Sequence, residues 1–304
     1  MGLLGAAKGI AYIAQNIKEK HDKVTITSEE DMINKFAAFS FEKGLVTNHL
    51  RMTASDSKKA SVYSSKIGGI PYMPKGYDYP CSKDGTPLRL LCQLNFTKLP
   101  DMEPFPKDGI LQIFISDSGK LDLLDYFGTE TEQDSFRIIY HESIIRKESE
   151  LKSAEEMPSF DSTAFPAVRE RVLIPAQPKP GIPSCLDFRF DGAVLEFAKK
   201  YRLCSKNAGS LNDIKNDAAE PLYRKFSYEG FSGIGGSGAF LERDPRSGEY
   251  KELLCCLFRL SDIEETCPDD EEIFAKADGA FQFFISYDAL KNKDFSRVLY
   301  DCEI

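Results

Sequence analysis

A charged segment, "LERDPR" at 241–246, holds the side chains best suited to bind a polar ligand or to catalyse a reaction. Glu242 and Asp244 are carboxylates, which can act as general acids or bases, and Arg246 can hold an anion through paired hydrogen bonds. These residue types indicate either a hydrolase or transferase that uses the carboxylates, or a non-catalytic binding site. A third interpretation is structural, because Asp-Pro-Arg also favours a surface turn.

A second polar group lies in "RLLCQLNF" at 89–96, which otherwise alternates like a strand. Strict alternation would place Arg89, Gln93 and Asn95 on one face. Such polar groups either satisfy backbone partners inside the fold or line a site. Arg89 and Gln93 therefore join the three charged residues above as candidate ligand-binding residues. If the two halves of the chain face each other, Gln93 and Glu242 could converge on a small polar ligand.

No complete catalytic constellation accompanies these residues. The sequence has no GxSxG, HExxH or P-loop motif, and its three histidines stand far apart. His141 lies in the strand-like run "IIYHES" and shares a face with Ser143, a pattern that fits an exposed pair equally well. No tight Cys/His cluster points to a metal, and we expect no cofactor. The sequence thus leans toward a binding protein rather than an enzyme, and catalytic residues stay unassigned.

The stretch "FSGIGGSGAF" contains G-x-G-x-x-G at Gly233, Gly235 and Gly238. A dinucleotide-binding loop must follow a strand and open a helix. The residues that follow include Pro245 and Gly248 and cannot form a helix of useful length. We therefore predict that the glycines provide a tight turn with positive φ, or a close approach of strands, in preference to a nucleotide loop.

Two stretches share the same order of features. The first reads "SKIGGIPYMP…PLRLLCQLNF…DGILQIFIS" and the second "SGIGGSGAF…KELLCCLFRL…DGAFQFFIS". The Gly-Gly pairs are 167 residues apart, the Leu-Leu-Cys segments 163, and the Asp-Gly segments 170. Three colinear matches predict an internal duplication of a β-rich unit with a pseudo-twofold relation.

Hydrophobic periodicity predicts more strands than helices and no alternation of β and α elements. The expected helices are 1–20, 28–38, 191–201 and 211–226, and the expected strands include 89–96, 110–116, 136–144 and 170–176, with a helical turn and a strand after residue 287. This pattern indicates an α+β fold dominated by antiparallel sheet, with N-terminal helices. The expected organisation is a helical extension at 1–60 that packs on the body, a first repeat with an insertion at 61–205 and a second repeat at 206–304, so that 61–304 forms one compact domain.

Composition restricts the partners. The chain has 304 residues, 42% of them hydrophobic, and a net charge of −9, which disfavours nucleic acid and anionic lipid. The eight cysteines form no CxxC, and no secretory signal is apparent, so free thiols in the cytoplasm are favoured over a disulfide framework. The first 20 residues are too short and too charged for a membrane span. They predict an amphipathic helix that packs on the body or docks on a partner or membrane surface.

The first of the two stretches resembles the YwqG-like family. Three motifs carry the likeness: GG-x-P-x-x-P at Gly68, Gly69, Pro71 and Pro74; G-x-P-L with a downstream Gln at Gly85, Pro87, Leu88 and Gln93; and a later Pro-x-x-Gly-x-Leu at Pro106, Gly109 and Leu111. In the second stretch Glu242 and Cys256 stand where the family pattern has Gln. The resemblance covers most of 61–304 and implies a duplicated β-rich fold of uncharacterised function. The acidic charge suits an immunity- or adaptor-like binding module.

Overall fold

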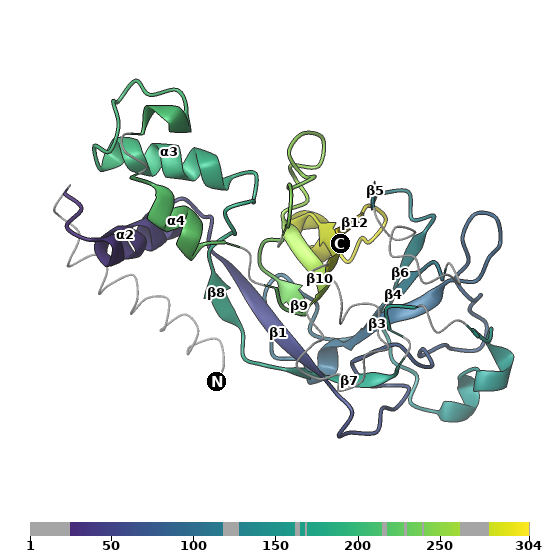
Figure 1. Ribbon diagram of the computed structural model, residues 1–304. Coiled ribbons are helices and arrows are strands. Elements are labelled where there is room, and N and C mark those ends of the chain that lie inside the picture. The colour runs from purple at the N-terminus through teal and green to yellow at the C-terminus, as the bar shows by residue number, and fades with distance from the viewer. Residues whose placement is uncertain are drawn as a thin grey trace. The chain divides into compact units, whose positions relative to one another are not determined.

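The computed structural model describes residues 25–117, 128–161, 165–167, 169–214, 218–227, 230–238, 240–261 and 280–303. The chain divides into two compact units (Figure 1). The helical unit comprises Met1–His49, Pro178–Gly230 and Gly235–Lys251, and the sheet unit comprises Leu50–Gln177, Phe231–Ile234 and Glu252–Ile304. The helix expected at 1–20 and Cys267 lie outside the described residues. No helix in the described part of the chain is long and apolar enough to cross a membrane.

The helical unit gathers α2 (Glu29–Glu42), α3 (Phe190–Lys200) and α4 (Glu220–Lys225) around an aromatic core. The predicted N-cap is confirmed, because the Ser28 hydroxyl accepts a hydrogen bond from the Asp31 backbone N–H at 3.1 Å. The Phe36 ring packs edge-on against Phe190 and Phe197, each with a centroid separation of 5.3 Å. This core joins helices that are about 150 residues apart in the sequence.

The single helix expected at 211–226 is wrong. The structure has a short turn at Leu211–Asp213 and then the separate helix α4. Pro221 lies in the first turn of α4, where its missing N–H leaves no helical hydrogen bond unmade. In the interior of a longer helix the same proline would remove a hydrogen bond and clash with the preceding turn, so the helix cannot run through it.

Among the described residues, the strands form a 12-stranded sheet in the order β5-β12-β11-β10-β9-β1-β7-β2-β3-β4-β6, with β8 paired to β1. Their bounds are β1 Thr47–Ser55, β2 Lys66–Ile67, β3 Arg89–Asn95, β4 Ile110–Ile115, β5 Gly128–Glu130, β6 Phe136–His141, β7 Arg171–Pro175, β8 Lys179–Gly181, β9 Gly233–Gly235, β10 Cys255–Ser261, β11 Ala280–Ile285 and β12 Leu299–Glu303. Helix α5 (Tyr287–Lys291) precedes β12, as the sequence predicts. The antiparallel ladders confirm an α+β fold dominated by antiparallel sheet.

Two sets of four strands share their order and local details: β2-β3-β4-β6 and β9-β10-β11-β12. The second strand of each set contains one β-bulge, at Leu91 in β3 and at Leu257 in β10. The Ser65 hydroxyl accepts a hydrogen bond from the Asn95 backbone N–H at 2.9 Å. In the second set the Ser232 hydroxyl accepts the equivalent bond from the Ser261 N–H at 3.1 Å. The two sets therefore repeat a side-chain contact as well as a strand order.

The glycine pairs also match. Gly68 and Gly69 have φ of 60° and 73°, and Gly235 and Gly236 have φ of 74° and 75°. The predicted positive-φ turn is confirmed, and the residues described from 240 to 251 contain no helix, as expected. The Leu-Leu-Cys match at a spacing of 163 residues is wrong. Since Gln93 and Arg259 occupy equivalent ladder positions opposite Gln112 and Gln282, the matching residues of β3 and β10 are 166 apart.

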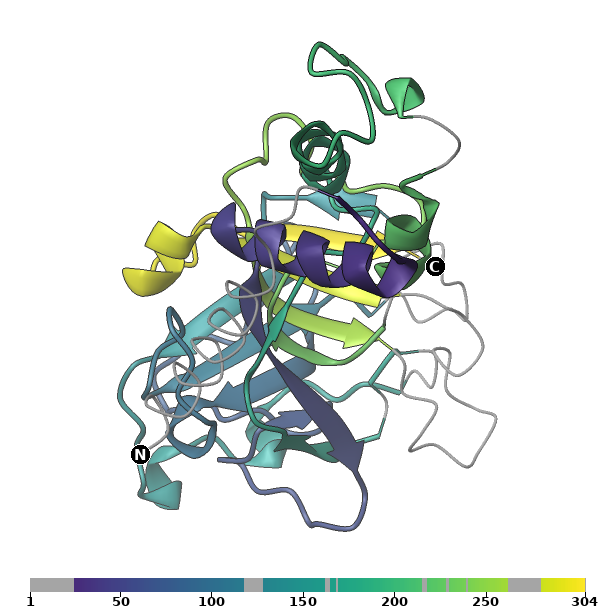
Figure 2. The same cartoon turned by 90° about the vertical axis from the view of Figure 1, so that its left-hand side faces the viewer.

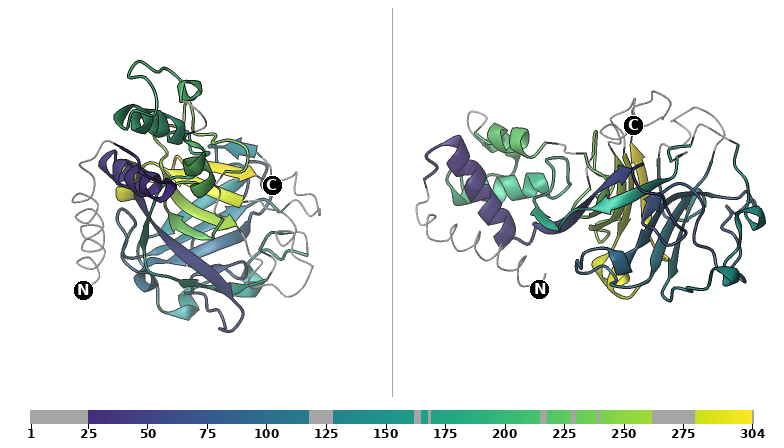
Figure 3. Two further views of the ribbon diagram at one scale, coloured as in Figure 1. Left: turned by 60° about the vertical axis from the view of Figure 1, so that its left-hand side comes forward. Right: turned by 90° about the horizontal axis from the view of Figure 1, so that it is seen from below.

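The sheet unit has one continuous hydrophobic core, to which both sets contribute. The Phe136 ring of β6 lies 5.7 Å from that of Phe283 in β11 and 5.6 Å from that of Tyr300 in β12. The sheet therefore curls so that its two halves pack against each other, and the blue strands lie beside the yellow ones in Figure 2 and Figure 3. The two ends of the strand order, β5 and β6, are consecutive in the chain.

Candidate functional site

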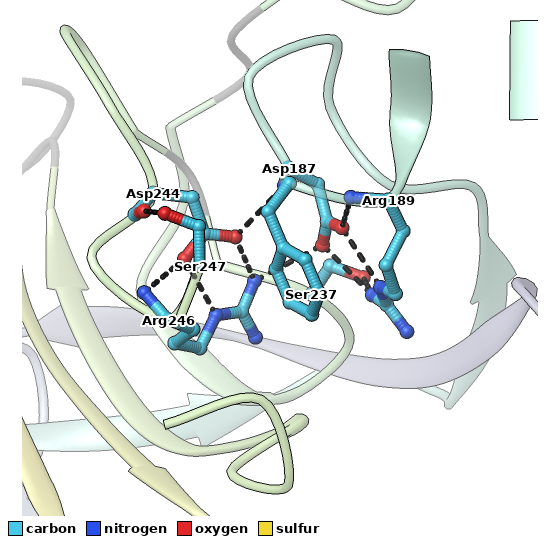
Figure 4. Close-up of polar contacts among 7 residues, drawn as sticks. Asp187, Arg189, Ser237, Asp244, Arg246 and Ser247 are labelled. Atoms are coloured by element: carbon cyan, nitrogen blue, oxygen red, sulfur yellow. Dashed lines mark hydrogen bonds and ion pairs between the residues drawn. The ribbon is translucent and has the colours of Figure 1, made fainter. Parts of the chain in front are cut away.

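The charged segment 241–246 divides between surface and interior of the helical unit. Glu242 is exposed, whereas Asp244 and Arg246 are buried. Arg246 Nε donates to Asp244 Oδ1 at 2.9 Å, and Arg246 Nη2 donates to Asp244 Oδ2 at 2.7 Å (Figure 4). Asp244 Oδ2 also accepts a hydrogen bond from the Phe188 backbone N–H. The two carboxylates therefore have unlike environments, and that of Asp244 is committed to an internal ion pair.

Asp187 and Arg189 form a second pair of the same kind, in which an arginine donates two hydrogen bonds to the carboxylate two residues before it. We call such a pair an Asp-x-Arg fork; this second fork was not predicted from the sequence. Arg189 donates to both oxygens of Asp187, from Nε at 2.8 Å and from Nη2 at 2.7 Å. The two forks are joined where Arg246 Nη2 donates to Asp187 Oδ2 at 3.0 Å. The signal was present in the sequence, since "DFR" and "DPR" repeat the same spacing. Paired Arg–carboxylate forks have the planar geometry that best satisfies buried charges.

The Asp-x-Arg cluster, defined as Asp187, Arg189, Asp244 and Arg246, balances two negative and two positive charges. Burial alone would raise the pKa of the Asp187 carboxyl, but the hydrogen bonds from Arg189 and the charge of Arg246 outweigh it and lower that pKa. Arg189 Nη2 donates further to Ser237 Oγ at 3.0 Å (Figure 4). Within the helical unit, the cluster connects the start of α3 to Ser237, Asp244 and Arg246.

In the sheet unit, Arg89 and Gln93 lie on opposite faces of β3, contrary to the strict alternation expected. The bulge at Leu91 adds one residue, so Arg89 pairs with Ile115 on the core face while Gln93 pairs with Gln112 on the other. Arg89 Nη1 donates to Asp117 Oδ2 at 2.8 Å, and its guanidinium lies over the Phe165 ring. Arg89 therefore forms an ion pair at the edge of the hydrophobic core.

The buried Gln93 carboxamide is fully hydrogen-bonded inside the sheet unit. Its Nε2 donates to the carbonyls of Val62 and Ser64, both at 2.9 Å. Its Oε1 accepts from the Tyr72 backbone N–H at 2.8 Å and from Gln112 Nε2 at 2.9 Å. These partners are the ones a structural glutamine needs. Gln93 belongs to the sheet unit and Glu242 to the helical unit.

His141 continues this buried network and is not the exposed partner of Ser143 that the sequence allowed. The His141 side chain is buried, whereas Ser143 is exposed. His141 Nε2 lies 3.1 Å from Gln112 Oε1, and the Tyr72 and Tyr77 rings meet its imidazole edge-on at 5.0 and 5.1 Å. Burial lowers the pKa of His141 to about 4, so the ring is neutral at pH 7.

The lowered pKa of His141 predicts acid sensitivity. Between the ordinary histidine pKa of about 6.5 and the folded value, the unfolded chain binds a proton that the folded chain excludes, so stability falls as pH falls. We expect a loss of up to about 3 kcal/mol between pH 7 and pH 4. Urea unfolding of the unaltered chain and of His141→Gln should show a shallower pH slope in the variant. Equal slopes would contradict the assignment.

An open groove of about 510 Å³ lies in the sheet unit, at a place the sequence did not indicate. It is lined by Glu132, Gln133, Arg137, Ile138, Tyr140, Lys293, Phe295 and Ser296. The first five residues belong to the β5–β6 turn and to β6, and the other three follow α5. The Tyr140 and Phe295 rings are in contact, with centroids 5.3 Å apart. The groove therefore combines charged, amide and aromatic surfaces from the two sets of strands.

Gln133 bridges the two sides of this groove. Its Oε1 accepts a hydrogen bond from the Ile138 backbone N–H at 2.9 Å. Its Nε2 donates to the Phe295 carbonyl at 2.7 Å and to the Ser296 carbonyl at 3.3 Å. Gln133 and Lys293 have φ of 50° and 58°, and they are two of the three described non-glycine residues with positive φ. Such strained residues are concentrated at binding and catalytic sites.

Two cations flank the bridge. Arg137 Nη2 donates to the carbonyls of Cys81 and Gln133, at 3.1 and 3.2 Å. Lys293 pairs with the exposed carboxylate of Glu142, which raises the pKa of the Lys293 ammonium. Exposed ion pairs of this kind contribute little to stability, so Lys293 can exchange Glu142 for another partner. The groove thus offers a positive charge that an acidic ligand group could reach.

The described residues contain no cluster of three or more His, Cys, Asp or Glu side chains placed to hold a metal ion. Cys81, Cys92, Cys185 and Cys204 have free thiols, the state that the sequence favoured. The fold places the protein in the α+β class, dominated by antiparallel sheet and with a separate helical unit. Residues 65–303 match the family described as "Domain of unknown function (DUF1963)", and the chain belongs to this family. No curated protein matches the chain.

Proposed function

We propose that the protein is a non-catalytic binding protein, and that its site is the groove between two duplicated β units. The observation that carries this proposal is the composition of the groove, whose walls come from the end of the first set of strands and from the α5–β12 segment of the second. Grooves that combine aromatic surface with a few directed polar groups are typical ligand sites. A protein segment and a small polar ligand both suit this lining.

The proposed duplication is supported by the matched bulges, glycines and Ser hydroxyl contacts of the two sets. The strands that flank them support it further. Leu173 N–H in β7 donates to the Ser65 carbonyl at 2.9 Å, and Met52 N–H in β1 donates to the Ser232 carbonyl at 2.8 Å. A pseudo-twofold axis between the paired strands β1 and β7 would relate these bonds. The duplicated architecture and the glycine-proline motifs together favour a YwqG-like member of the family.

The alternative, a hydrolase or transferase that uses Glu242 and Asp244, is less well supported. Both oxygens of Asp244 accept hydrogen bonds from Arg246, and one also accepts from the Phe188 N–H. A general acid or base must reach the substrate proton, which a buried carboxylate engaged in this way does not. Binding therefore accounts better for the geometry of these residues.

The acidic charge of −9 supports an immunity- or adaptor-like role without nucleic acid as partner, and the free thiols of Cys81, Cys92, Cys185 and Cys204 support a cytoplasmic location. An amphipathic segment at 1–20 that docks on a partner remains part of the proposal. The groove would supply the specific contacts.

Filling the groove should abolish binding. Ser296 is an exposed groove residue, and Ser296→Trp would occupy the space with a large ring. In a thermal-shift screen of metabolites and peptides, we expect ligands that raise the Tm of the unaltered chain by several degrees and bind Ser296→Trp at least tenfold more weakly. Ser143→Trp places the same ring on an exposed serine that does not line the groove, and it should bind normally. Ligands that bind all three chains equally would refute the groove as the site.

A further inference from the structure

The groove runs along an unpaired strand edge. β6 is the last strand of the sheet and pairs only with β4 among the described strands. The Ile138 N–H points away from β4, because it donates to Gln133 Oε1. Alternate residues of a strand present their backbone groups to the same side, so Tyr140 presents its own to this free edge as well. Unpaired strand edges are ready templates for another strand.

The Gln133 carboxamide occupies the position of a missing peptide group. In a central strand, each peptide unit accepts a hydrogen bond from one neighbour and donates one to the other. The Gln133 carboxamide does the same, accepting from the Ile138 N–H and donating to the Phe295 carbonyl. The segment that contains Phe295 and Ser296 is therefore spaced from β6 so that an amide group fits between them. Gln133 keeps a positive φ of 50° in making this bridge.

We propose that the ligand of the groove is an extended peptide segment that inserts as a strand between β6 and the Phe295–Ser296 backbone and displaces the Gln133 carboxamide. This inference rests on the proposed binding function and specifies its ligand class. The peptide carbonyl accepts from the Ile138 N–H, and a peptide N–H donates to the Phe295 carbonyl. Side chains on one face of the inserted strand pack on the Tyr140–Phe295 ring pair. Recognition through the main chain gives affinity, and the side-chain contacts give selectivity.

The test uses a display library of random linear 12-residue peptides, selected on the unaltered full chain and counter-selected on Ser296→Trp. A selected peptide is then synthesised with a single N-methyl group at each position in turn. Insertion as a strand between two backbones predicts an affinity loss of at least tenfold at consecutive positions in the bound stretch, because successive N–H groups face β6 and the Phe295–Ser296 backbone in turn, and little effect outside it. The affinities of the N-methylated peptides are measured on the unaltered chain, so this readout does not depend on how a substitution folds.

Gln133→Gly gives a second readout. It removes the competing carboxamide and relieves the positive-φ strain, so we expect the selected peptide to bind this variant several-fold more tightly. Loss of affinity in a folded Gln133→Gly chain, or N-methyl groups that leave the affinity unchanged at every position of the peptide, would overturn the peptide proposal. If only metabolites bind the groove, the binding function holds and the peptide proposal fails. If no probe distinguishes the unaltered chain from Ser296→Trp, both fail.

Discussion

Asp187→Asn is expected to lower the free energy of unfolding of the helical unit by about 3–5 kcal/mol, the usual effect of removing one member of a buried ion network. The substitution leaves Arg246, whose side chain is fully buried, with one fewer charged partner, and it weakens the fork to Arg189. The contribution of Asp187 requires its ionised carboxylate. Because its pKa is lowered in the fold, that contribution is present at neutral pH and is lost as pH falls below the ordinary Asp value of about 4.

Guanidinium denaturation followed by far-ultraviolet circular dichroism measures this effect. Glu220→Gln is the control, since it removes an exposed carboxylate that pairs with Arg224, and it should cost about 0.5 kcal/mol or less. The double variant Asp187→Asn/Arg246→Met should lose less free energy of unfolding than the two single variants lose in sum. Each single substitution leaves a charge without its former partner, and the second substitution removes that charge. Strict additivity would mean that the Asp-x-Arg cluster is not energetically coupled.

Gly68→Ala is expected to destabilise the sheet unit by about 3 kcal/mol or more, through positive-φ strain together with a backbone clash. Gly68 has φ of 60°, and a Cβ atom there would lie 2.2 Å from the Ala167 carbonyl oxygen. The clash is with backbone, so no side-chain rotation relieves it. The effect should appear as a lower Tm and a lower denaturation midpoint.

Gly85→Ala separates the effect of positive-φ strain from the effect of the backbone clash. Gly85 also has positive φ, of 87°, but a Cβ there would meet no atom within 4 Å. We expect it to cost only the conformational strain, about 1–2 kcal/mol. Equal destabilisation by the two substitutions would show that the close approach of Gly68 to Ala167 is not important for the fold.

Local signals in the sequence predicted most elements of the fold. Ser28 marks the start of α2, and the apolar run from 110 closely matches β4. The bulge at Leu91 could not be predicted, because "LLC" is apolar throughout and an extra residue leaves no mark on its pattern. Because strict alternation leaves out this extra residue, it predicted the wrong face of β3 for Arg89. Pro221, in contrast, was a visible reason to divide the expected helix.

The site was harder to predict than the fold. The sequence identified Asp244 and Arg246 as notable, and the structure joins them in a buried ion pair. The groove was missed because its walls lie about 160 residues apart and consist of ordinary residues such as Gln133 and Ser296. Their significance comes from backbone conformation and from the unpaired edge of β6, which depend on the folding of the whole sheet.

Hydrogen exchange measured by mass spectrometry, with and without a saturating selected ligand, tests the central claim most directly. The account predicts slower exchange in segments covering 132–140 and 293–296, the two walls of the groove. It predicts no comparable change in α2 or α3. Protection confined to the helical unit, or distributed without regard to the groove, would contradict the claim that this unclosed edge of the sheet is the binding site.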